Sequence, residues 1–363
     1  MKLALTGGGT GGHIFPALAV MEALRVSEGD SLEVRFFGPE NRGERRLVEA
    51  AGVPFETVPS AGVRGRGPVS LVRSAWSLLS GVVTAVRKLR AYKPDAIFST
   101  GGYGSFPASV AAKLLRRPLV VYLPDVSPGW AVRAEKMLAT KVTTTTEAAL
   151  AHLPAKKTVV TGYPVRDAFF SIERAAMRES LGISTDALAV VIAGASQGAR
   201  AINAAVYSAL AELLPRATVF HVTGEAGFEE ATRQKAQLPT ALAANYQPAA
   251  FRADLPALMV TCDLGVFRAG ASVLGEVPAA KLPSVLIPGT FAGGHQRDNA
   301  RWLAEGGAAV TLDESELASL GEILAGLLTD AARREAMRTA AANLARPDAA
   351  SAIAAVLKEV AKK

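Results

Sequence analysis

Three segments of the sequence place a run of small residues between an apolar stretch and an alanine-rich stretch. They are Ala4-Leu-Thr-Gly-Gly-Gly-Thr-Gly-Gly-His13, Phe98-Ser-Thr-Gly-Gly-Tyr-Gly104 and Ile192-Ala-Gly-Ala-Ser-Gln-Gly198. Glycine lets backbone N–H groups converge on a ligand, and the start of a following helix carries partial positive charge. Phosphate is the ligand that this arrangement favours. For any one segment, a tight turn between a strand and a helix is the alternative interpretation.

His13 ends the first of these segments and is the candidate catalytic base. A histidine side chain ordinarily has a pKa of ~6.5, so it can accept a proton from a hydroxyl group near neutral pH. The alternative is that His13 only caps the loop or hydrogen-bonds to it. Reach to a substrate hydroxyl distinguishes the two roles.

Several other chemistries are disfavoured by the residue content. Cys262 is the one cysteine, and the four histidines have no short metal-ligand spacing, so we expect no metal site and a reducing compartment. No Gly-Lys-Ser/Thr occurs, which argues against a P-loop nucleotidase. The glycines at 7, 9 and 12 match a dinucleotide-binding fingerprint, but Glu33, the nearest acid at about the right distance, lies in a strand pattern that continues to Gly38.

Alternating strand and helix patterns supply the elements that would position these loops. Strands are predicted at 3–6, 32–37, 96–100, 119–123, 188–193, 218–222, 264–267 and 284–287, with helical patterns between them. The fold class is therefore α/β, with two doubly wound, Rossmann-like domains. Pro164 discourages regular structure, and we expect a hinge near it. The predicted domains are residues 1–163 and 164–344, followed by a C-terminal helix at about 345–363.

The chain carries 40 Lys and Arg against 33 Asp and Glu, a net charge of +7 over 363 residues. From Thr57 to Pro94 there is no acidic residue, and seven basic residues alternate with Trp76, Leu78, Leu79, Val82 and Val83. Such a stretch can lie on an anionic membrane surface. The alternative is a helix with an apolar stripe toward the core and a solvated basic back. No nucleic acid is expected as a partner, because no groove-reading or base-stacking module accompanies the charge.

Neither export nor a membrane span is expected. Glycines from Gly7 onward interrupt the apolar core that a secretory signal needs. No stretch approaches the roughly 18 uninterrupted apolar residues of a transmembrane helix.

In order and spacing, the motifs resemble the MurG-type N-acetylglucosaminyltransferases of peptidoglycan synthesis, which have the GT-B fold of two domains facing across a cleft. The markers are Thr6-Gly-Gly-Gly-Thr-Gly-Gly-His-Ile-Phe-Pro16, Thr100-Gly-Gly-Tyr103, Gly162-Tyr-Pro-Val-Arg166, Gly194-Ala-Ser-Gln-Gly-Ala199, Arg268-Ala-Gly-Ala271 followed by Glu276, and His295-Gln-x-x-Asn-Ala300. The resemblance implies inverting transfer of GlcNAc from UDP-GlcNAc to the C4 hydroxyl of MurNAc in undecaprenyl-pyrophosphoryl-MurNAc-pentapeptide. It implies no cofactor, and the absence of any Asp-x-Asp is consistent with transfer that needs no metal.

The resemblance also implies that the helix at about 345–363 packs back on the first domain. It further implies which residues bind each substrate. For the donor they are Thr10, Gly12, Arg166, Ser196, Gln197, Phe251, Ala271, Ser272, Glu276, His295 and Gln296. Within this set, Glu276 would accept hydrogen bonds from the ribose hydroxyls, and Phe251 would lie beside uracil. For the acceptor they are Gly9, Gly11, Gly101, Gly102, Tyr103 and Asp125. The protein would act at the cytoplasmic face of the membrane as a peripheral enzyme, with cell-wall synthesis proteins as further partners.

The sequence departs from the family pattern at several positions, and one departing segment bears most directly on the acceptor. Where relatives commonly have His-Glu-Gln-Asn, this chain reads Tyr122-Leu-Pro-Asp125, which removes two polar groups from the acceptor side. Two other functions therefore stay open. One is another GT-B enzyme, such as a different lipid glycosyltransferase or a UDP-GlcNAc 2-epimerase. The other is a homologue that binds a UDP-sugar without catalysis.

Overall fold

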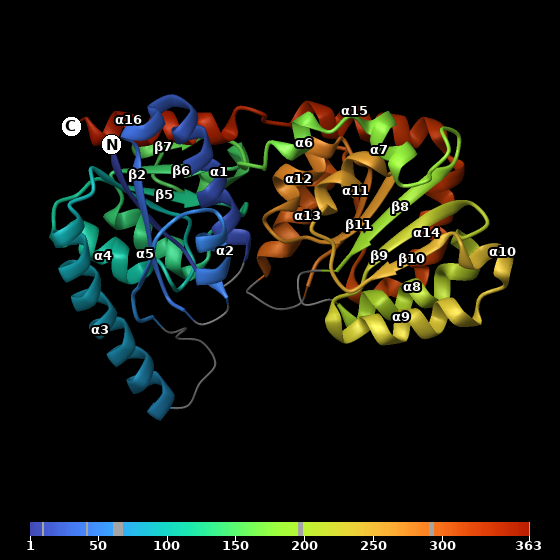
Figure 1. The fold of residues 1–363 in the computed structure, drawn as a ribbon, viewed down its shortest axis with the longest axis horizontal. Helices are drawn as coiled ribbons and strands as arrows, with labels where there is room; N and C mark the ends of the chain where they lie inside the picture. The colour runs from blue at the N-terminus through green and yellow to red at the C-terminus, as the bar shows by residue number, and fades with distance from the viewer. Residues whose placement is uncertain (9–10, 41–42, 61–67, 195–198, 290–293, 363) are drawn as a thin grey trace. The chain divides into compact units, whose positions relative to one another are not determined.

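The structure is a computed structural model that describes residues 1–8, 11–40, 43–60, 68–194, 199–289 and 294–362. The chain divides into two compact units, coloured along its length in Figure 1. Unit 1 comprises Met1–Arg166 and Arg346–Lys363, and unit 2 comprises Asp167–Ala345. The chain thus leaves the first unit three residues after the predicted boundary at 163 and returns to it near 345.

The described residues of unit 1 form a seven-stranded parallel sheet in the order β3-β2-β1-β4-β5-β6-β7. Its strands are β1 Lys2–Thr6, β2 Glu33–Gly38, β3 Phe55–Thr57, β4 Ala96–Ser99, β5 Leu119–Leu123, β6 Lys141–Thr144 and β7 Thr158–Val160. Because β1 pairs with both β2 and β4, the strand order reverses beside β1. In open parallel sheets, ligands bind beyond the carboxyl ends of the strands at such a point. The first two glycine-rich segments follow β1 and β4.

Helices cover both faces of this sheet (Figure 1). They are α1 Gly11–Glu28, α2 Glu44–Ala50, α3 Pro68–Tyr92, α4 Phe106–Leu114, α5 Trp130–Leu138 and α16 Ala349–Ala361, with short 3-10 turns at Gly29–Ser31, Glu147–His152 and Ala155–Lys157. The longest, α3, packs against α4, and its N-terminal end extends beyond the rest of unit 1 (Figure 1).

The described residues of unit 2 form a six-stranded parallel sheet in the order β10-β9-β8-β11-β12-β13. The strands are β8 Leu188–Ala193, β9 Ala217–Val222, β10 Tyr246–Ala249, β11 Leu264–Arg268, β12 Ser284–Ile287 and β13 Ala309–Thr311. The helices are α6 Ala168–Ser171, α7 Arg174–Ser180, α8 Arg200–Leu213, α9 Glu225–Gln237, α10 Thr240–Ala243, α11 Leu255–Thr261, α12 Val273–Ala280, α13 His295–Glu305, α14 Leu320–Thr329 and α15 Ala331–Leu344, with a 3-10 turn at Glu314–Ser319. Two doubly wound parallel sheets confirm the predicted α/β architecture.

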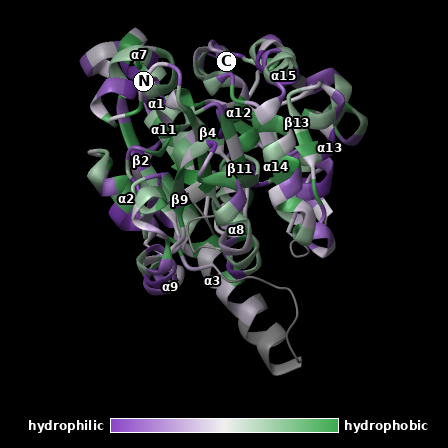
Figure 2. Ribbon diagram, turned by 90° about the vertical axis from the view of Figure 1, so that its right-hand side faces the viewer, coloured by the Kyte–Doolittle hydropathy of each residue, from purple (hydrophilic) through white to green (hydrophobic). Residues whose placement is uncertain are grey.

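Hydrophobic residues concentrate on the strands, as β4 and β11 show in Figure 2, whereas outer helices such as α9 are largely hydrophilic. Both faces of a parallel sheet are covered by helices, so its strands are apolar almost throughout. In β4 and β12 every residue is buried. This burial holds the carboxyl ends of the strands in fixed positions.

The last helix, α16, belongs to unit 1 and packs against α1. Its buried face includes Ile353, Leu357 and Val360, spaced as one side of a helix. Lys358 Nζ lies 2.9 Å from Glu28 Oε1 at the end of α1. The C-terminal helix therefore completes the core of the first unit.

Candidate active site

The two glycine-rich loops of unit 1 contact each other through their backbones. Gly101 and Gly102 have φ values of +81° and +85°, where residues with a Cβ are strained. A Cβ on Gly102 would lie 2.1 Å from the carbonyl oxygen of Gly8, and one on Gly7 would lie 2.3 Å from Thr100 Oγ1. Because neither site has room for a side chain, the loops after β1 and β4 form one continuous surface.

His13, in the first turn of α1, is held against this surface. Its Nδ1 lies 2.8 Å from the carbonyl oxygen of Thr100, and Thr100 Oγ1 donates a hydrogen bond to the His13 carbonyl oxygen at 2.6 Å. A carbonyl oxygen only accepts, so Nδ1 carries the hydrogen. In the neutral imidazole, Nε2 then has the free lone pair. The contact fixes the loop, and it also leaves His13 with a nitrogen suited to accept a proton.

Two residues from the end of unit 1 flank the start of α1. Tyr163 Oη donates to the Gly12 carbonyl oxygen at 3.5 Å. The Arg166 guanidinium lies 5.4 Å from the centre of the Phe15 ring, in the range of a cation–π contact. Gly11 is the first residue of α1. The structure thus gathers Gly12 and Arg166, both expected to bind the donor, around one helix start in unit 1.

The segment that departs from the family pattern serves the core of unit 1. Tyr122 is fully buried on β5, with its hydroxyl 2.7 Å from Thr145 Oγ1 and its ring packed against Phe98 and Tyr163. Burial raises the pKa of Tyr122 well above its ordinary value. Asp125, beyond the strand, is partly exposed and is the remaining acidic group of this segment.

Tyr103, from the predicted acceptor set, is also partly exposed. Its carbonyl oxygen accepts a hydrogen bond from Ser60 Oγ at 2.5 Å. The backbone of Tyr103 is thus fixed by a residue that precedes α3.

In unit 2, five of the expected donor residues follow β11 and β12. Ala271 and Ser272 form the turn before α12, and Glu276 lies in the first turn of that helix. The Asn299 side chain donates to the Ala269 carbonyl oxygen at 3.0 Å, which ties α13 to this turn. The turn before α12 is therefore fixed at its base, and the backbone N–H groups from Val273 to Glu276 already donate to the carbonyl oxygens of residues 270–272.

The start of α13 carries His295 and Gln296. Gln296 Oε1 accepts a hydrogen bond from the Gly289 backbone N–H at 2.8 Å, so this amide ties the start of α13 to the residue that lies two positions after β12. Arg268, at the end of β11, lies 3.0 Å from Glu314 Oε2.

Other predicted residues are not part of these contacts. Phe251 follows β10 and is 69% exposed, so its ring is accessible to a ligand. Gly9, Thr10, Ser196 and Gln197 lie outside the described residues.

A buried acid beneath the second glycine-rich loop was missed by sequence reasoning. Glu135 on α5 is 0% exposed, and the hydroxyl groups of Ser99 and Ser105 hydrogen-bond to its carboxyl group. Helical spacing is the sequence signal that could have indicated its burial, because Glu135 lies on the same face of the helix as Ala131 and Val132, which are also buried.

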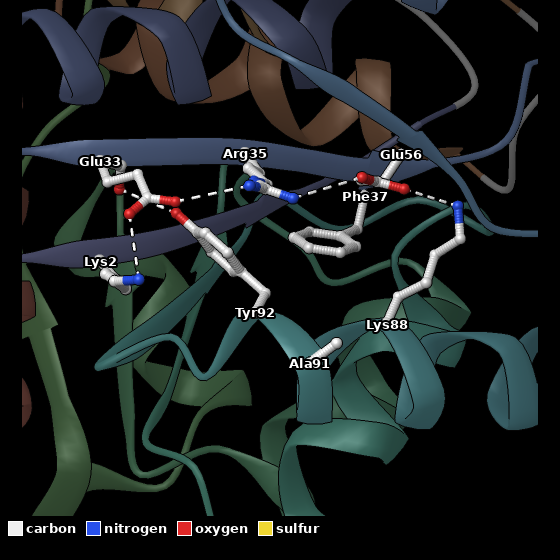
Figure 3. A pocket seen from close by; sticks show the side chains of 8 residues that line it. All are labelled: Lys2, Glu33, Arg35, Phe37, Glu56, Lys88, Ala91 and Tyr92. Carbon is white, nitrogen blue, oxygen red and sulfur yellow. Dashed lines mark hydrogen bonds and ion pairs between the residues drawn. The ribbon is translucent and has the colours of Figure 1, made fainter.

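A pocket of about 210 Å³ lies elsewhere in unit 1, between the sheet and α3. Figure 3 shows its charged side chains in a row. Glu33 pairs with Lys2 at 3.1 Å and Arg35 at 3.6 Å, and Glu56 pairs with Lys88 at 2.6 Å and Arg35 at 3.6 Å. Tyr92 also donates to the Glu33 carbonyl oxygen at 2.9 Å. These opposed charges join the last turns of α3 to the sheet, away from the glycine-rich loops.

No helix in the described part of the chain is both long enough and apolar enough to cross a membrane. Among the described residues, no group of three or more His, Cys, Asp or Glu side chains is arranged to hold a metal ion.

Comparison with known proteins agrees with this geometry. The N-terminal domain of glycosyltransferase family 28 matches residues 3–144, and its C-terminal domain matches residues 189–353. These ranges contain the glycine-rich loops of unit 1 and the α12 and α13 loops of unit 2.

Two curated relatives are named UDP-N-acetylglucosamine–N-acetylmuramyl-(pentapeptide) pyrophosphoryl-undecaprenol N-acetylglucosamine transferase. The protein from Symbiobacterium thermophilum is 36% identical, over 100% of this chain and 97% of the relative. The protein from Roseiflexus sp. is 35% identical, over 99% of this chain and 94% of the relative.

Solved structures show the same fold. MurG of Acinetobacter baumannii superposes with a TM-score of 0.77 and 26% identity, covering 99% of both chains. The UDP-GlcNAc 2-epimerase of Neisseria meningitidis has a TM-score of 0.68 and 16% identity, covering 99% of this chain and 100% of that one, which is a likeness of fold alone. With both family domains matched and whole-length relatives above 30% identity, the chain belongs to glycosyltransferase family 28, in its MurG type.

Proposed function

We propose that this protein transfers N-acetylglucosamine from UDP-GlcNAc to the C4 hydroxyl of MurNAc in undecaprenyl-pyrophosphoryl-MurNAc-pentapeptide, with inversion at the anomeric carbon. The observation that carries the proposal is the whole-length similarity to relatives whose names state this donor and this acceptor. The loops of the chain supply the groups that the reaction needs.

Unit 2 binds the donor in this proposal. The turn at Ala271 and Ser272, with the partial positive charge at the start of α12, meets the diphosphate. Glu276, in the first turn of α12, accepts hydrogen bonds from the ribose hydroxyls. His295 and Gln296, at the start of α13, contact the sugar, and the exposed ring of Phe251 stacks on uracil.

His13 is the base in this proposal. As the C4 oxygen of the acceptor forms its bond to the anomeric carbon, the bond from that carbon to the diphosphate breaks and its electron pair leaves on UDP. The hydroxyl proton moves to Nε2 of His13, since Nδ1 is committed to Thr100. Attack from the face opposite to the leaving group inverts the configuration.

Charge on the departing UDP is stabilised by the start of α12 and by Arg166, whose guanidinium is permanently charged. The sequence has no Asp-x-Asp, and we propose that transfer needs no divalent metal.

The proposal places the enzyme on the cytoplasmic face of the membrane, where α3 contacts lipid. Trp76, Leu79 and Val83 are exposed along one side of α3, and Arg87 and Arg90 continue the same side. Apolar side chains can enter the lipid interface while the arginines meet anionic head groups. Arg64 and Arg66, from the predicted basic stretch, lie outside the described residues.

The test is transfer of radiolabelled GlcNAc from UDP-GlcNAc to a short-chain analogue of the lipid-linked acceptor, with lipid-free MurNAc-pentapeptide as control and with EDTA in a parallel arm. We expect labelled lipid product at the same rate with and without EDTA. Loss of transfer in EDTA would overturn the metal-independent part alone, and donor binding without transfer would favour a non-catalytic homologue.

A further inference from the structure

The buried carboxyl group of Glu135 joins the two ends of the second glycine-rich loop. Ser99, at the end of β4, donates from Oγ to Glu135 Oε2 at 2.8 Å. Ser105, directly before α4, has its Oγ 2.6 Å from Glu135 Oε1. The loop between these serines contains Gly101 and Gly102, which pack on the first glycine-rich loop. Glu135 thus lies directly beneath the proposed acceptor surface.

Counting protons shows that Ser105 cannot serve both of its neighbours when Glu135 is ionised. Ser105 Oγ lies 2.8 Å from the Gly102 carbonyl oxygen as well as 2.6 Å from the carboxyl group. Both neighbours are acceptors in that state, and a hydroxyl group has one hydrogen to donate. With Glu135 protonated, the carboxyl group donates to Ser105, and Ser105 donates to Gly102.

Ser99 does not face this conflict. Its Oγ accepts from the Gly101 backbone N–H at 3.2 Å and donates to Glu135. The carboxyl group can accept that bond in either protonation state. Ser105 is therefore the hydroxyl group whose orientation depends on Glu135.

Among the described residues, the Gly102 carbonyl oxygen accepts one other hydrogen bond. The backbone N–H of Ser105 reaches it at 3.4 Å, which is long for a hydrogen bond. A Cβ on Gly102 would lie 3.2 Å from His13 Cδ2, so this peptide is in close contact with the proposed base. Losing the Ser105 hydroxyl loosens Gly102 at the place where it supports His13.

We propose that Glu135 is a positioning residue for the acceptor loop: in its protonated form it directs Ser105 onto Gly102 and holds the loop against His13, and in its ionised form it releases Gly102. The role in acceptor binding rests on the proposed function. The hydrogen-bond exchange itself does not.

The surroundings of Glu135 let this exchange occur near neutral pH. Burial raises the pKa of Glu135 to about 7, and the hydroxyl groups of Ser105, Ser99 and Ser109 lower it by less. The elements packed on α5 include α4, which carries Ser109, and β5, and the direct hydrogen bonds to the carboxyl group come from Ser99 and Ser105. Among the described residues, no charged group contributes to the shift.

The substitution Glu135→Gln tests the exchange, because an amide fits the same space and donates to Ser105 at every pH. Hydrogen–deuterium exchange of the peptide spanning residues 99–109 compares the variant with wild type at matched pH. We expect equal protection at about pH 5.5 and about 2- to 10-fold faster exchange in wild type at about pH 8.5, the equivalent of one hydrogen bond. Glu56→Gln, which removes a charge from the row in Figure 3, should follow wild type.

The kinetic arm uses the acceptor KM. We expect that of wild type to rise about 2- to 10-fold between about pH 6 and pH 8.5, that of Glu135→Gln to stay level, and the donor KM to change alike in both. In a Ser105→Ala background, Glu135→Gln should have no further effect on that profile. Equal exchange protection in wild type and Glu135→Gln at high pH would overturn the hydrogen-bond exchange. A protection difference without any transfer activity would instead contradict the proposed function.

Discussion

At the scale of single residues, His13 is defined by the hydrogen bond that it makes to Thr100. Because Nδ1 donates to a carbonyl oxygen, the proton-accepting role falls to Nε2. The contact that could make His13 purely a loop residue thus also orients it for the proposed role as a base. A substitution that keeps the first role and removes the second can separate them.

His13→Asn is that substitution. The asparagine amide can donate to the Thr100 carbonyl oxygen as Nδ1 does, but it cannot take up a proton. We expect kcat to fall about 10²- to 10⁴-fold while the donor KM stays near wild type. Steady-state transfer to the lipid analogue measures both constants. If His13→Asn transfers at the wild-type rate while His13→Ala does not, the histidine acts on the loop only.

Glu276 should act on the donor. Glu276→Gln weakens hydrogen bonds from the ribose hydroxyls to a charged carboxylate, which are worth about 1.5–3 kcal/mol. We expect the donor KM to rise about 10-fold or more, with a smaller fall in kcat. Glu305→Gln, at the exposed end of α13, is the matched control. An unchanged donor KM for Glu276→Gln would contradict the ribose role.

Glu135 should also affect stability in a way that depends on pH. The pKa of its carboxyl group is about 7 in the folded chain against an ordinary 4.5, so the folded state binds the proton more tightly and loses stability as pH rises through this window. The full cost, roughly 3 kcal/mol, is reached above pH 7. Glu135→Gln should therefore be more stable than wild type at about pH 8, and the gain should disappear below about pH 4.5. Denaturant unfolding across this range measures it, and a gain that is constant with pH would refute the assignment.

At the scale of elements, α3 has two halves with different surroundings. Its last turns are joined to the sheet by Lys88 and Tyr92 (Figure 3). Its middle turns expose Trp76 and Val83, 72% and 70% accessible to solvent. A helix fixed at one end can present the other to a lipid surface.

Val83→Ser tests this surface, and Val26→Ser is a matched control because Val26 on α1 is 89% exposed but far in sequence from the basic stretch. Losing a buried valine costs about 1.5 kcal/mol, or about tenfold in affinity. We expect Val83→Ser to bind vesicles containing phosphatidylglycerol about tenfold more weakly, by cosedimentation, and Val26→Ser to bind as wild type does. Equal losses in the two variants would exclude a specific role for α3.

Strong apolar patterns made the central strands predictable from the sequence, whereas the shortest strands were not predicted. The strands Leu119–Leu123, Leu188–Ala193 and Ser284–Ile287 have the predicted bounds, since a continuous apolar run between turn residues marks a buried parallel strand. The strands Phe55–Thr57 and Thr158–Val160 have three residues each, too few for a periodic signal. Tertiary pairing with a neighbour, not local preference, makes them strands.

The candidate site, too, could be predicted from the sequence only in part. Glycine-rich loops are visible in sequence because glycine is needed wherever backbones approach closely, as Gly102 approaches Gly8. The hydrogen bonds of Glu135 could not be predicted from its local sequence, because its partners Ser99 and Ser105 come from other elements. Tyr122 was expected on the acceptor side, and its burial in the core follows from its place on a central strand.

At the scale of the whole molecule, the chain builds two separate cores and returns to the first. Leu357 on α16 is fully buried in unit 1, and Leu327 on α14 is 1% exposed in unit 2. A mutation in α16 should therefore destabilise the unit that lies first in the sequence.

Leu357→Ala and Leu327→Ala form a matched pair for this prediction. Each should cost about 2–5 kcal/mol, because a large buried side chain is lost. We expect faster hydrogen–deuterium exchange in peptides of unit 1 for Leu357→Ala and in peptides of unit 2 for Leu327→Ala. Leu357→Ala that loosened unit 2 alone would show that α16 does not complete the first core.

The central claim is that this chain forms a glycosidic bond to a lipid-linked sugar. The most direct measurement is NMR analysis of the products from UDP-GlcNAc with the short-chain lipid analogue and, separately, without any acceptor. The account predicts a β-linked GlcNAc on the C4 oxygen of MurNAc when the acceptor is present, and intact UDP-GlcNAc when it is absent. Conversion of UDP-GlcNAc to its 2-epimer without acceptor, or an α linkage in the lipid product, would contradict it.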